Sequence, residues 1–234
     1  MVYENSLDFA IHKDEHDPLR AYRNEFIFPD TVEKASLYFS GNSLGLMPRK
    51  AKDYVNSELD DWGRYGVLGH TGKENGWLSY HELVTADMAA VVGGKPDEVV
   101  VMNTLTVNLH LMMVSFYRPS GSRRKIVIEK STFPSDVYAV KSQIAFHGGD
   151  PERDLIFLES RDGGAILRTE DILSTIDSQH EEIALVMLGG VNYLSGQVYD
   201  IAEITGRCRL LGINVGFDLA HGAGNIPLDL HDWG

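Results

Sequence analysis

The sequence has little cysteine and no long apolar segment: Cys208 is the single cysteine in 234 residues. One cysteine excludes an internal disulfide and a cluster of cysteine metal ligands. No early segment joins a basic stretch to an apolar one, and no apolar run has the length that crosses a membrane. These absences exclude disulfide-stapled and membrane-spanning classes, and we expect a soluble cytoplasmic protein.

Basic residues are also scarce, with 21 Lys and Arg against 34 Asp and Glu and a net charge of −13. The densest basic stretch, 123–125, is expected to be the solvated approach to a strand. So acidic a chain is a poor electrostatic match for nucleic acid or an anionic membrane, and we expect neither as a partner. The share of apolar residues, 43%, is typical of a soluble globular enzyme.

Several catalytic motifs are absent too. No G-x-G-x-x-G follows a strand-like run, and no G-x-S-x-G is present. The stretch 69–74 resembles a phosphate loop, but it lacks the first glycine at the required spacing and has Glu74 where Ser or Thr would bind Mg²⁺. The acids and histidines at 218–232 do not have the spacing of a metal site, so we expect none.

What the sequence does contain is a regular alternation of short apolar runs and helical stretches. Continuous apolar runs separated by helices favour an α/β fold, with a mostly parallel sheet covered by helices on both faces. Upstream, Pro48 opens a helix to Trp62, and a glycine-rich loop leads to a helix at 77–92. We expect an N-terminal arm at 1–45 and an incomplete large α/β domain at 46–234. The predicted strands are 99–102, 126–128, 155–158, 183–188 and 213–217, and the predicted helices between them are 104–117, 134–148, 170–180 and 200–211.

Polar or glycine-rich loops follow four of these strands, where ligands of open α/β sheets bind. Residues 103–106 open a helix and are either an anion site or an ordinary helix cap. Residues 131–136 bring a hydroxyl, an aromatic ring and an acid to a helix N-terminus, or are a first turn with a hydrophobic staple. The glycines at 189–190 allow close backbone approach, or form a turn.

The fourth loop begins at Asp218, where the apolar run 213–217 stops, and continues through His221 into Gly222 and Gly224. The alternative is an aspartate that caps a turn and a histidine that fills a surface gap. Because the four loops share one edge of one predicted sheet, we expect a ligand there.

Four runs of residues carry a resemblance to a known family: YFSGNSLGL at 38–46, NTLTVNLH at 103–110, FPSD at 133–136 and GFDLAH at 216–221. These runs resemble kynureninases. This family has an aspartate-aminotransferase-like fold, uses pyridoxal 5'-phosphate (PLP), and usually forms homodimers. The resemblance, from about Tyr22 to Gly234, implies hydrolysis of L-kynurenine or 3-hydroxykynurenine to alanine and anthranilate or 3-hydroxyanthranilate, in tryptophan catabolism and the route to NAD.

The resemblance also implies how the cofactor is held. Leu105 and Thr106 resemble the phosphate-binding pair, and Phe133 resembles the aromatic residue that stacks on the pyridine ring. Asp218 resembles the carboxylate that keeps the ring nitrogen protonated, which makes the ring a better electron sink. The implied cofactor-binding residues are Leu105, Thr106, Phe133, Pro134, Ser135, Asp136, Gly189, Asp218 and His221.

The substrate residues and the catalytic lysine are implied in the same way. Ser43 and His70 resemble residues of the pocket for an aromatic ketone amino acid. The sequence departs from the family at Gly189, where many relatives have a serine. The resemblance implies that the Schiff-base lysine lies beyond Gly234, and no lysine follows Lys141 in this sequence. We therefore expect no catalytic residue among these residues and no efficient turnover by them alone. The alternative is a non-catalytic PLP-binding or interaction protein of this fold.

Overall fold

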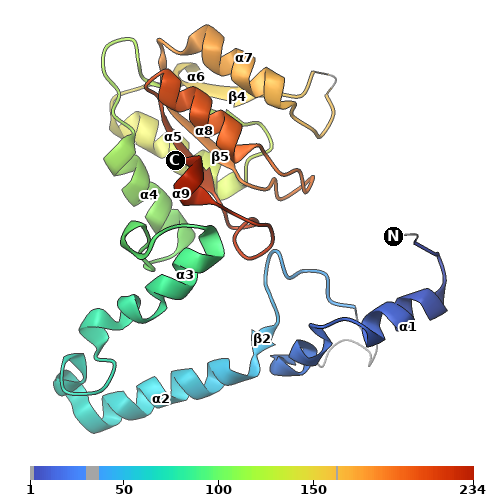
Figure 1. The fold of residues 1–234 in the computed structure, drawn as a ribbon. Helices are drawn as coiled ribbons and strands as arrows, with labels where there is room; N and C mark the ends of the chain where they lie inside the picture. The colour runs from blue at the N-terminus through green and yellow to red at the C-terminus, as the bar shows by residue number, and fades with distance from the viewer. Residues whose placement is uncertain (1–2, 30–36, 162) are drawn as a thin grey trace. The chain divides into compact units, whose positions relative to one another are not determined.

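The structure is a computed structural model that describes residues 3–29, 37–161 and 163–234. Contacts divide the chain into two compact units, Met1–Leu78 and Ser79–Gly234. Figure 1 shows the sheet and its covering helices in the second unit, coloured from green to red. A domain boundary between residues 45 and 46 stays a prediction.

The first unit is mainly helical, with one long helix, α2, among shorter ones. Its long helix begins directly after Pro48, as the sequence predicts, and ends at Gly66, whose φ of 52° is one that glycine adopts without strain. Neither α-helix of the unit contains a buried residue in the described part of the chain. The elements are α1 Leu7–Glu15, η1 Arg20–Glu25, β1 Phe26–Ile27, β2 Met47–Pro48, α2 Arg49–Tyr65 and η2 Gly66–His70.

The helix predicted at 77–92 is two helices. A 3-10 helix, η3, covers Trp77–Val84, and an α-helix, α3, covers Thr85–Val92. At the junction the hydroxyl of Thr85 donates to the carbonyl oxygen of His81 over 3.0 Å. Such a back-bond from a threonine often bends a helix, and it accompanies the change of helix type here.

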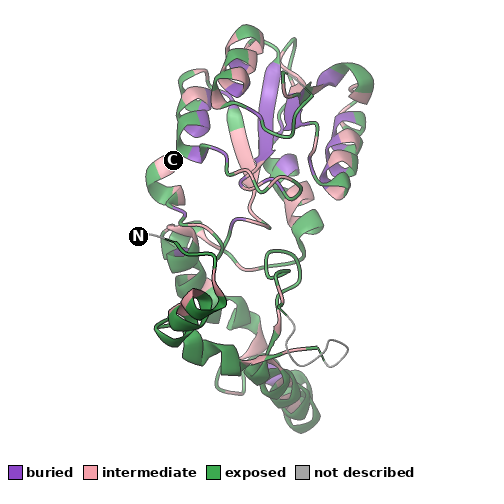
Figure 2. Cartoon of the chain, turned by 90° about the vertical axis from the view of Figure 1, so that its right-hand side faces the viewer, coloured by how far each residue is buried: buried purple, intermediate pink, exposed green. Residues whose placement is uncertain are grey.

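The second unit contains a four-stranded parallel sheet in the order β4-β3-β5-β6. This arrangement confirms the predicted α/β class. The central strands are apolar and almost completely buried, because both faces of the sheet are covered (Figure 2). The strands are β3 Lys125–Glu129, β4 Leu155–Leu158, β5 Ile183–Gly189 and β6 Asn214–Asp218.

Two apolar clusters lie on opposite faces of the sheet, because side chains alternate along each strand. Ile126 and Ile128 pack with α4 and α5, whereas Val127 packs with α7 and α8. Cys208 of α8 is fully buried in the second cluster, and burial raises the pKa of its thiol to about 12. The helices of this unit are η4 Pro96–Glu98, α4 Leu105–Phe116, α5 Pro134–Phe146, α6 Pro151–Asp154, α7 Thr169–Gln179, α8 Ile201–Leu210 and α9 Leu230–Trp233.

The strand predicted at 99–102 is wrong. These residues have no strand conformation, and Val100 and Met102 are 55% and 38% exposed. A strand needs a neighbour for its backbone N–H and C=O groups, and no described strand pairs with this run. By contrast, β6 does form a strand, and it pairs with β5 alone among the described strands. An apolar, β-branched composition was therefore not sufficient to form a strand.

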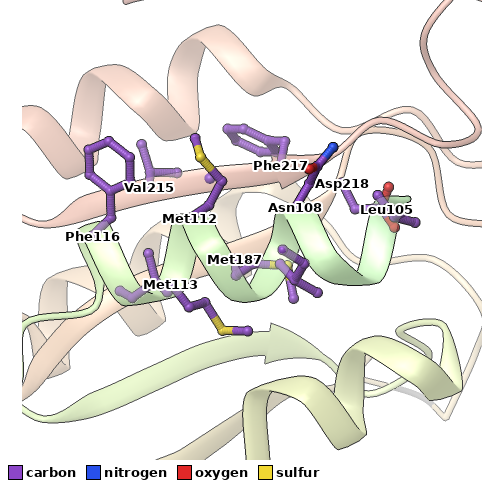
Figure 3. Close-up of a pocket in the computed structure, with 12 residues that line it drawn as sticks. Leu105, Asn108, Met112, Met113, Phe116, Met187, Val215, Phe217 and Asp218 are labelled. Atoms are coloured by element: carbon purple, nitrogen blue, oxygen red, sulfur yellow. The ribbon is translucent and has the colours of Figure 1, made fainter. Parts of the chain in front are cut away.

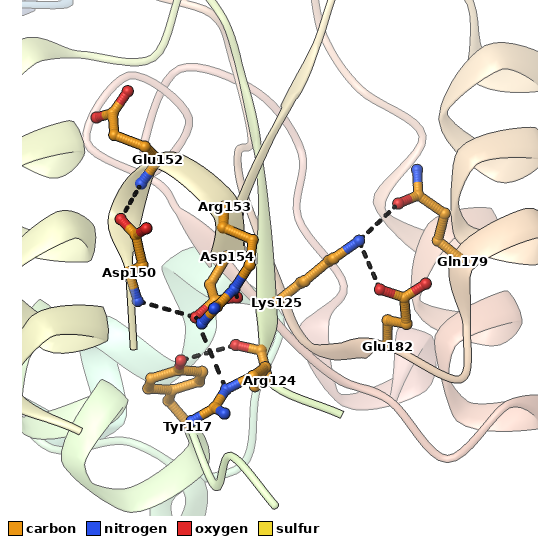
Figure 4. Close-up of polar contacts among 9 residues, drawn as sticks. All are labelled: Tyr117, Arg124, Lys125, Asp150, Glu152, Arg153, Asp154, Gln179 and Glu182. Atoms are coloured by element: carbon orange, nitrogen blue, oxygen red, sulfur yellow. Dashed lines mark hydrogen bonds and ion pairs between the residues drawn. The ribbon is translucent and has the colours of Figure 1, made fainter. Parts of the chain in front are cut away.

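Ion pairs fasten the amino-terminal end of the sheet (Figure 4). Asp154 is 1% exposed; its carboxylate accepts two hydrogen bonds of 2.8 Å from Arg153 and lies 3.7 Å from Arg124. The hydrogen bond from Arg153, the largest influence, helps to lower the pKa of Asp154 to about 2. Lys125 pairs with Glu182 over 2.6 Å. The basic stretch 123–125 thus holds neighbouring elements together and is more than a solvated approach to β3.

Among the helices in the described residues, none is both long enough and apolar enough to cross a membrane.

Candidate functional site

A small cleft lies at the carboxyl end of the sheet, between the loops that follow β3, β5 and β6. The register of β5 and β6 places Gly189 opposite Asp218. The free space in the cleft is about 20 Å³, room for roughly one water molecule. The structure thus brings together five of the predicted cofactor residues. The cleft is lined by Glu129, Thr132, Phe133, Asp136, Gly189, Val191, Tyr193, Asp218 and His221.

Asp218 ends β6 and has two kinds of contact. Its Oδ1 accepts the backbone N–H of Ala220 over 2.8 Å, which is the turn-capping role of the alternative interpretation. Its side chain also hydrogen-bonds Asp136 and lines the cleft. The backbone oxygen of Asp218 accepts the N–H of Gly190 over 2.8 Å, which fixes the end of the strand. Asp218 therefore caps its turn and also presents a carboxylate to the cleft.

Asp136 is a buried acid in the first turn of α5, with 2% of its surface exposed. Its Oδ1 accepts a hydrogen bond of 3.2 Å from the Ser135 hydroxyl. Burial raises the pKa of Asp136 to about 7, and the hydrogen bond and negative charge of Asp218 add to the increase. Two carboxyl groups that hydrogen-bond to each other share a proton. Asp136 is therefore protonated in roughly half of the molecules at neutral pH.

Aromatic rings form the other wall of the cleft. Phe133, the residue before α5, is 45% exposed, so its ring has a free surface for stacking. The ring centroid of Tyr193 lies 5.0 Å from that of Phe133 with an interplanar angle of 73°, and 6.3 Å from the ring of His221. Sequence reasoning did not select Tyr193, because an aromatic residue in a loop after a glycine pair has no distinctive pattern.

The N-terminus of α4 lies next to a second, apolar groove of about 300 Å³ (Figure 3). Leu105 and Asp218 line the same groove, which runs between α4 and the strands β5 and β6. Thr104 occupies the N-cap position, but its side chain makes no capping hydrogen bond. Thr106 is exposed in the first helical turn. Because that side chain does not cap the helix, first-turn N–H groups are available to an anion, as predicted for a phosphate.

The glycine pair permits close approach between neighbouring groups. A Cβ atom at Gly190 would lie 2.4 Å from Leu219 Cδ2, a distance that real atoms do not adopt. A Cβ atom at Gly189 would lie 3.0 Å from Oε1 of Glu129. A side chain at position 190 would therefore push the end of the Leu219 side chain aside, and one at position 189 would press on the Glu129 carboxyl group.

Glu129 is a cleft residue that sequence reasoning missed. It is the last residue of β3 and is 2% exposed, and its Oε1 and Oε2 accept the N–H of Gly189 over 3.1 and 3.4 Å. Burial raises the pKa of Glu129, and the negative charge of Asp218 raises it further, while hydrogen bonds act in the opposite direction. The signal in the sequence was an acid directly after the apolar run 126–128. The predicted strand ended at residue 128 and so left Glu129 out.

The two predicted substrate residues belong to the first unit. Ser43 lies in a turn, where its N–H donates to the carbonyl oxygen of Ser40 over 3.0 Å. His70 is the last residue of η2, and its ring packs edge-on against Trp77 at 5.3 Å. Lys73, in the stretch that only superficially resembles a phosphate loop, pairs with Glu58 over 2.8 Å. A substrate pocket that includes Ser43 and His70 stays a prediction.

Within the ranges that the structure describes, no group of three or more His, Cys, Asp or Glu residues has an arrangement that would hold a metal ion.

Three curated relatives that match the chain over nearly its whole length are all named kynureninase. The chain is 56% identical over 234 residues to the kynureninase of Myxococcus xanthus, covering 100% of this chain and 55% of that relative. It is 50% identical over 233 residues to the kynureninase of Flavobacterium psychrophilum, again covering 55% of the relative. It is 46% identical to the kynureninase of Nematostella vectensis, covering 97% of this chain and 52% of the relative. No family model matches the chain.

Solved structures show the same fold at low sequence identity. A C-DES mutant with glycine covalently linked to its PLP cofactor matches with a TM-score of 0.66 at 18% identity, over 89% of this chain and 52% of that one. The cysteine desulfurase of Thermococcus onnurineus NA1 matches with a TM-score of 0.57 at 19% identity, over 93% of this chain and 48% of that one. The sequence comparisons are the more specific: the chain is similar along its whole length to kynureninases and spans about half the length of the curated relatives it matches.

Proposed function

We propose that this chain is part of a PLP-dependent hydrolase that cleaves L-kynurenine or 3-hydroxykynurenine to alanine and anthranilate or 3-hydroxyanthranilate. The observation that carries the proposal is the convergence of Phe133, Asp136 and Asp218 on one cleft. It occurs in a chain 56% identical to a kynureninase over its whole length. We propose further that the enzyme works as a cytoplasmic homodimer in tryptophan catabolism and NAD biosynthesis, as the family resemblance implies.

The residues present fit PLP. The half-exposed Phe133 ring offers a stacking surface, and Asp218 offers a carboxylate to a protonated ring nitrogen. The N-terminus of α4, where Leu105 and Thr106 lie, offers N–H groups to a phosphate. Leu105 and Asp218 line one groove, so the phosphate and ring positions border the same space. When bound, PLP supplies an electron sink for the carbon skeleton of an amino acid.

The chain's own residues would orient and charge the ring. Asp218 holds a proton at the ring nitrogen, because a carboxylate beside that nitrogen favours its protonated form. Asp136, buried beside Asp218, would hold the Asp218 side chain in place through the hydrogen bond between the two carboxyl groups. Gly189 and Gly190 leave the backbone accessible at the end of β5, and His221 lines the same cleft.

We also propose that the Schiff-base lysine lies outside these residues. In support, no lysine follows Lys141, which is on α5 and pairs with Glu152 over 3.0 Å. The 234-residue chain would then bind PLP without turning over substrate. A non-catalytic PLP-binding protein is the alternative, and the kynureninase relatives along the whole chain do not favour it.

Two proteins test the proposal. The first is the 234-residue chain, titrated with PLP and followed by absorbance and fluorescence. We expect saturable binding that Asp218→Asn weakens about tenfold or more, since it removes a charge-assisted hydrogen bond. Asp229→Asn is the matched control, because Asp229 is exposed at the N-cap of α9 and makes no capping bond.

The second protein is a chimera, in which this chain is followed by the remaining length of the Myxococcus xanthus kynureninase. We expect the chimera to release anthranilate from kynurenine, detected by anthranilate fluorescence. A folded chimera that binds PLP and leaves both kynurenine and 3-hydroxykynurenine intact would exclude the proposed reaction. Turnover by the 234-residue chain itself would show that the lysine is not required outside it.

A further inference from the structure

Glu129 is a buried acid for which the proposed function has no role. It ends β3, and its two side-chain oxygens lie 3.1 and 3.4 Å from the backbone nitrogen of Gly189, at the end of β5. In β3 and β5, Ile126 pairs with Leu185 and Val127 pairs with Val186, and the described pairing stops short of the carboxyl ends of both strands. Beyond the last paired residues, the hydrogen bond from the Gly189 N–H to the Glu129 carboxyl group therefore connects the end of β5 to β3.

The charges around Glu129 are mostly of its own sign. Asp136 of α5 and Asp218 of β6 line the same cleft, and the chain's nearest lysine in sequence, Lys130, pairs instead with Glu159 over 2.9 Å. The hydroxyl of Thr132 and the N–H of Gly189 are the neighbouring donors. Tyr199, in the loop after β5, has a pKa raised mainly by burial and further by the charge of Glu129. His221, in the loop after β6, also lines the cleft.

Three carboxyl groups in one largely buried cleft are not all ionised together, because burial and mutual repulsion both oppose charge. Asp218 is the most accessible of the three, since Glu129 and Asp136 are each 2% exposed. Asp218 also accepts a backbone N–H from its own turn over 2.8 Å, which helps to hold its side chain in place. Burial, in contrast, raises the pKa of both Glu129 and Asp136.

We propose that Glu129 is a positioning residue that acts as an uncharged carboxylic acid: it fastens the end of β5 to β3 and leaves Asp218 as the carboxylate available to a cationic ring. The part that concerns the ring rests on the proposed function. The part that concerns Glu129 itself does not, because it depends only on the ligand-free protein. The absence of a side chain at Gly189 suits this contact, because a Cβ atom there would lie 3.0 Å from Oε1 of Glu129.

The test compares Glu129→Gln with Glu129→Ala in the ligand-free 234-residue chain. Glutamine has the shape of a protonated glutamate and retains an oxygen that accepts the Gly189 N–H. Alanine removes that acceptor and leaves a buried N–H without a partner. Glu181→Gln is the matched control, because Glu181 is exposed in the turn before β5.

Melting temperature is measured from mildly acidic to mildly alkaline pH. A carboxyl group with a raised folded-state pKa binds its proton more tightly in the folded protein, so its stabilising contribution is lost as the pH rises through that pKa. We therefore expect the wild type to lose stability relative to Glu129→Gln as the pH rises, and Glu129→Ala to melt several degrees lower throughout. Equal losses in Glu129→Gln and Glu129→Ala would overturn the uncharged role, and no loss in Glu129→Ala would overturn the positioning role.

Difference infrared spectra provide a readout that does not depend on the variants' stability. Asp136 contributes a protonated-carboxyl stretch to every spectrum at neutral pH, so the readout is the difference between two proteins. The difference between the wild type and Glu129→Gln is expected to contain a further protonated-carboxyl stretch, and the difference between the wild type and Glu181→Gln is expected to lack it. Absence of that stretch from the first difference spectrum would overturn the proposal. With PLP, we expect Glu129→Gln to bind as the wild type does and Glu129→Ala to bind about tenfold more weakly. If the wild type does not bind PLP, the proposed function fails, while the melting and infrared results still decide the role of Glu129.

Discussion

Asp154 provides a stability prediction whose magnitude follows from the structure. Its carboxylate is buried at the amino-terminal end of the sheet and accepts two hydrogen bonds of 2.8 Å from Arg153. The pKa of Asp154 is lowered from 3.8 to about 2. At about 1.4 kcal/mol for each pKa unit, this shift corresponds to about 2 kcal/mol of stability at neutral pH.

The sign of the pH dependence is fixed by the direction of that shift. Because the folded-state pKa is depressed, the contribution is present above the ordinary pKa of 3.8 and is lost as the pH falls through about 2. Asp154→Asn removes the charge, so we expect it to lower the free energy of unfolding by about 2 kcal/mol at neutral pH, and by less as the solution becomes acidic. Urea denaturation at a series of pH values measures both quantities.

A surface ion pair is the control for this experiment. Asp177 pairs with Arg207 over 2.5 Å, but both side chains are about 40% exposed. Because solvent screens this pair, Asp177→Asn is expected to cost much less stability than Asp154→Asn. Equal losses for Asp154→Asn and Asp177→Asn, or a loss for Asp154→Asn that stays constant into acid, would refute the reasoning from burial and charge.

Four further predictions follow from packing and charge. Gly190→Ala is expected to lower the unfolding free energy by about 1 kcal/mol or less in urea denaturation, because the Leu219 Cδ2 atom, 2.4 Å from the Cβ position, ends a flexible side chain that can move aside. Cys208 is expected to resist thiol reagents until the chain unfolds, since its thiol is buried. Asp136→Asn is expected to flatten the pH dependence of the melting temperature, because the raised pKa of Asp136 makes the wild type lose stability as the pH rises through about 7. The 234-residue chain is expected to self-associate in light scattering, because Met112 and Phe116 beside the groove are 52% and 48% exposed; a monodisperse monomer would contradict this.

Much of the second unit's secondary structure was predictable, because buried parallel strands are continuous apolar runs. Each of four predicted runs matches a strand to within one residue at each end: 126–128, 155–158, 183–188 and 213–217. The run 99–102 has the same composition and is not a strand. Composition describes what a residue would do in a sheet, whereas strand formation also requires a partner, and the sequence contains no local signal for that partner.

The candidate site divides in a similar way. Asp218 and Gly189 were predicted to lie together because both follow strands of one parallel sheet, and the register pairs them. Glu129 was missed because its role depends on a hydrogen bond to Gly189, which is 60 residues away. Tyr193 was missed because the path of a loop decides which ring meets Phe133. Positions fixed by the sheet were predictable, and contacts fixed by loops were not.

The strand order has a consequence for synthesis of the chain. β3 is made first, β4 and β5 then pair with its two edges, and β6 pairs with the outer edge of β5. Each new strand therefore meets a partner that has already left the ribosome, so the sheet can grow outward as translation proceeds. Phe133 and Glu129 emerge early, while Asp218 arrives with the last of these strands. Asp218, which we propose meets a cationic ring, is thus synthesised after Glu129, Phe133 and Gly189, which line the same cleft.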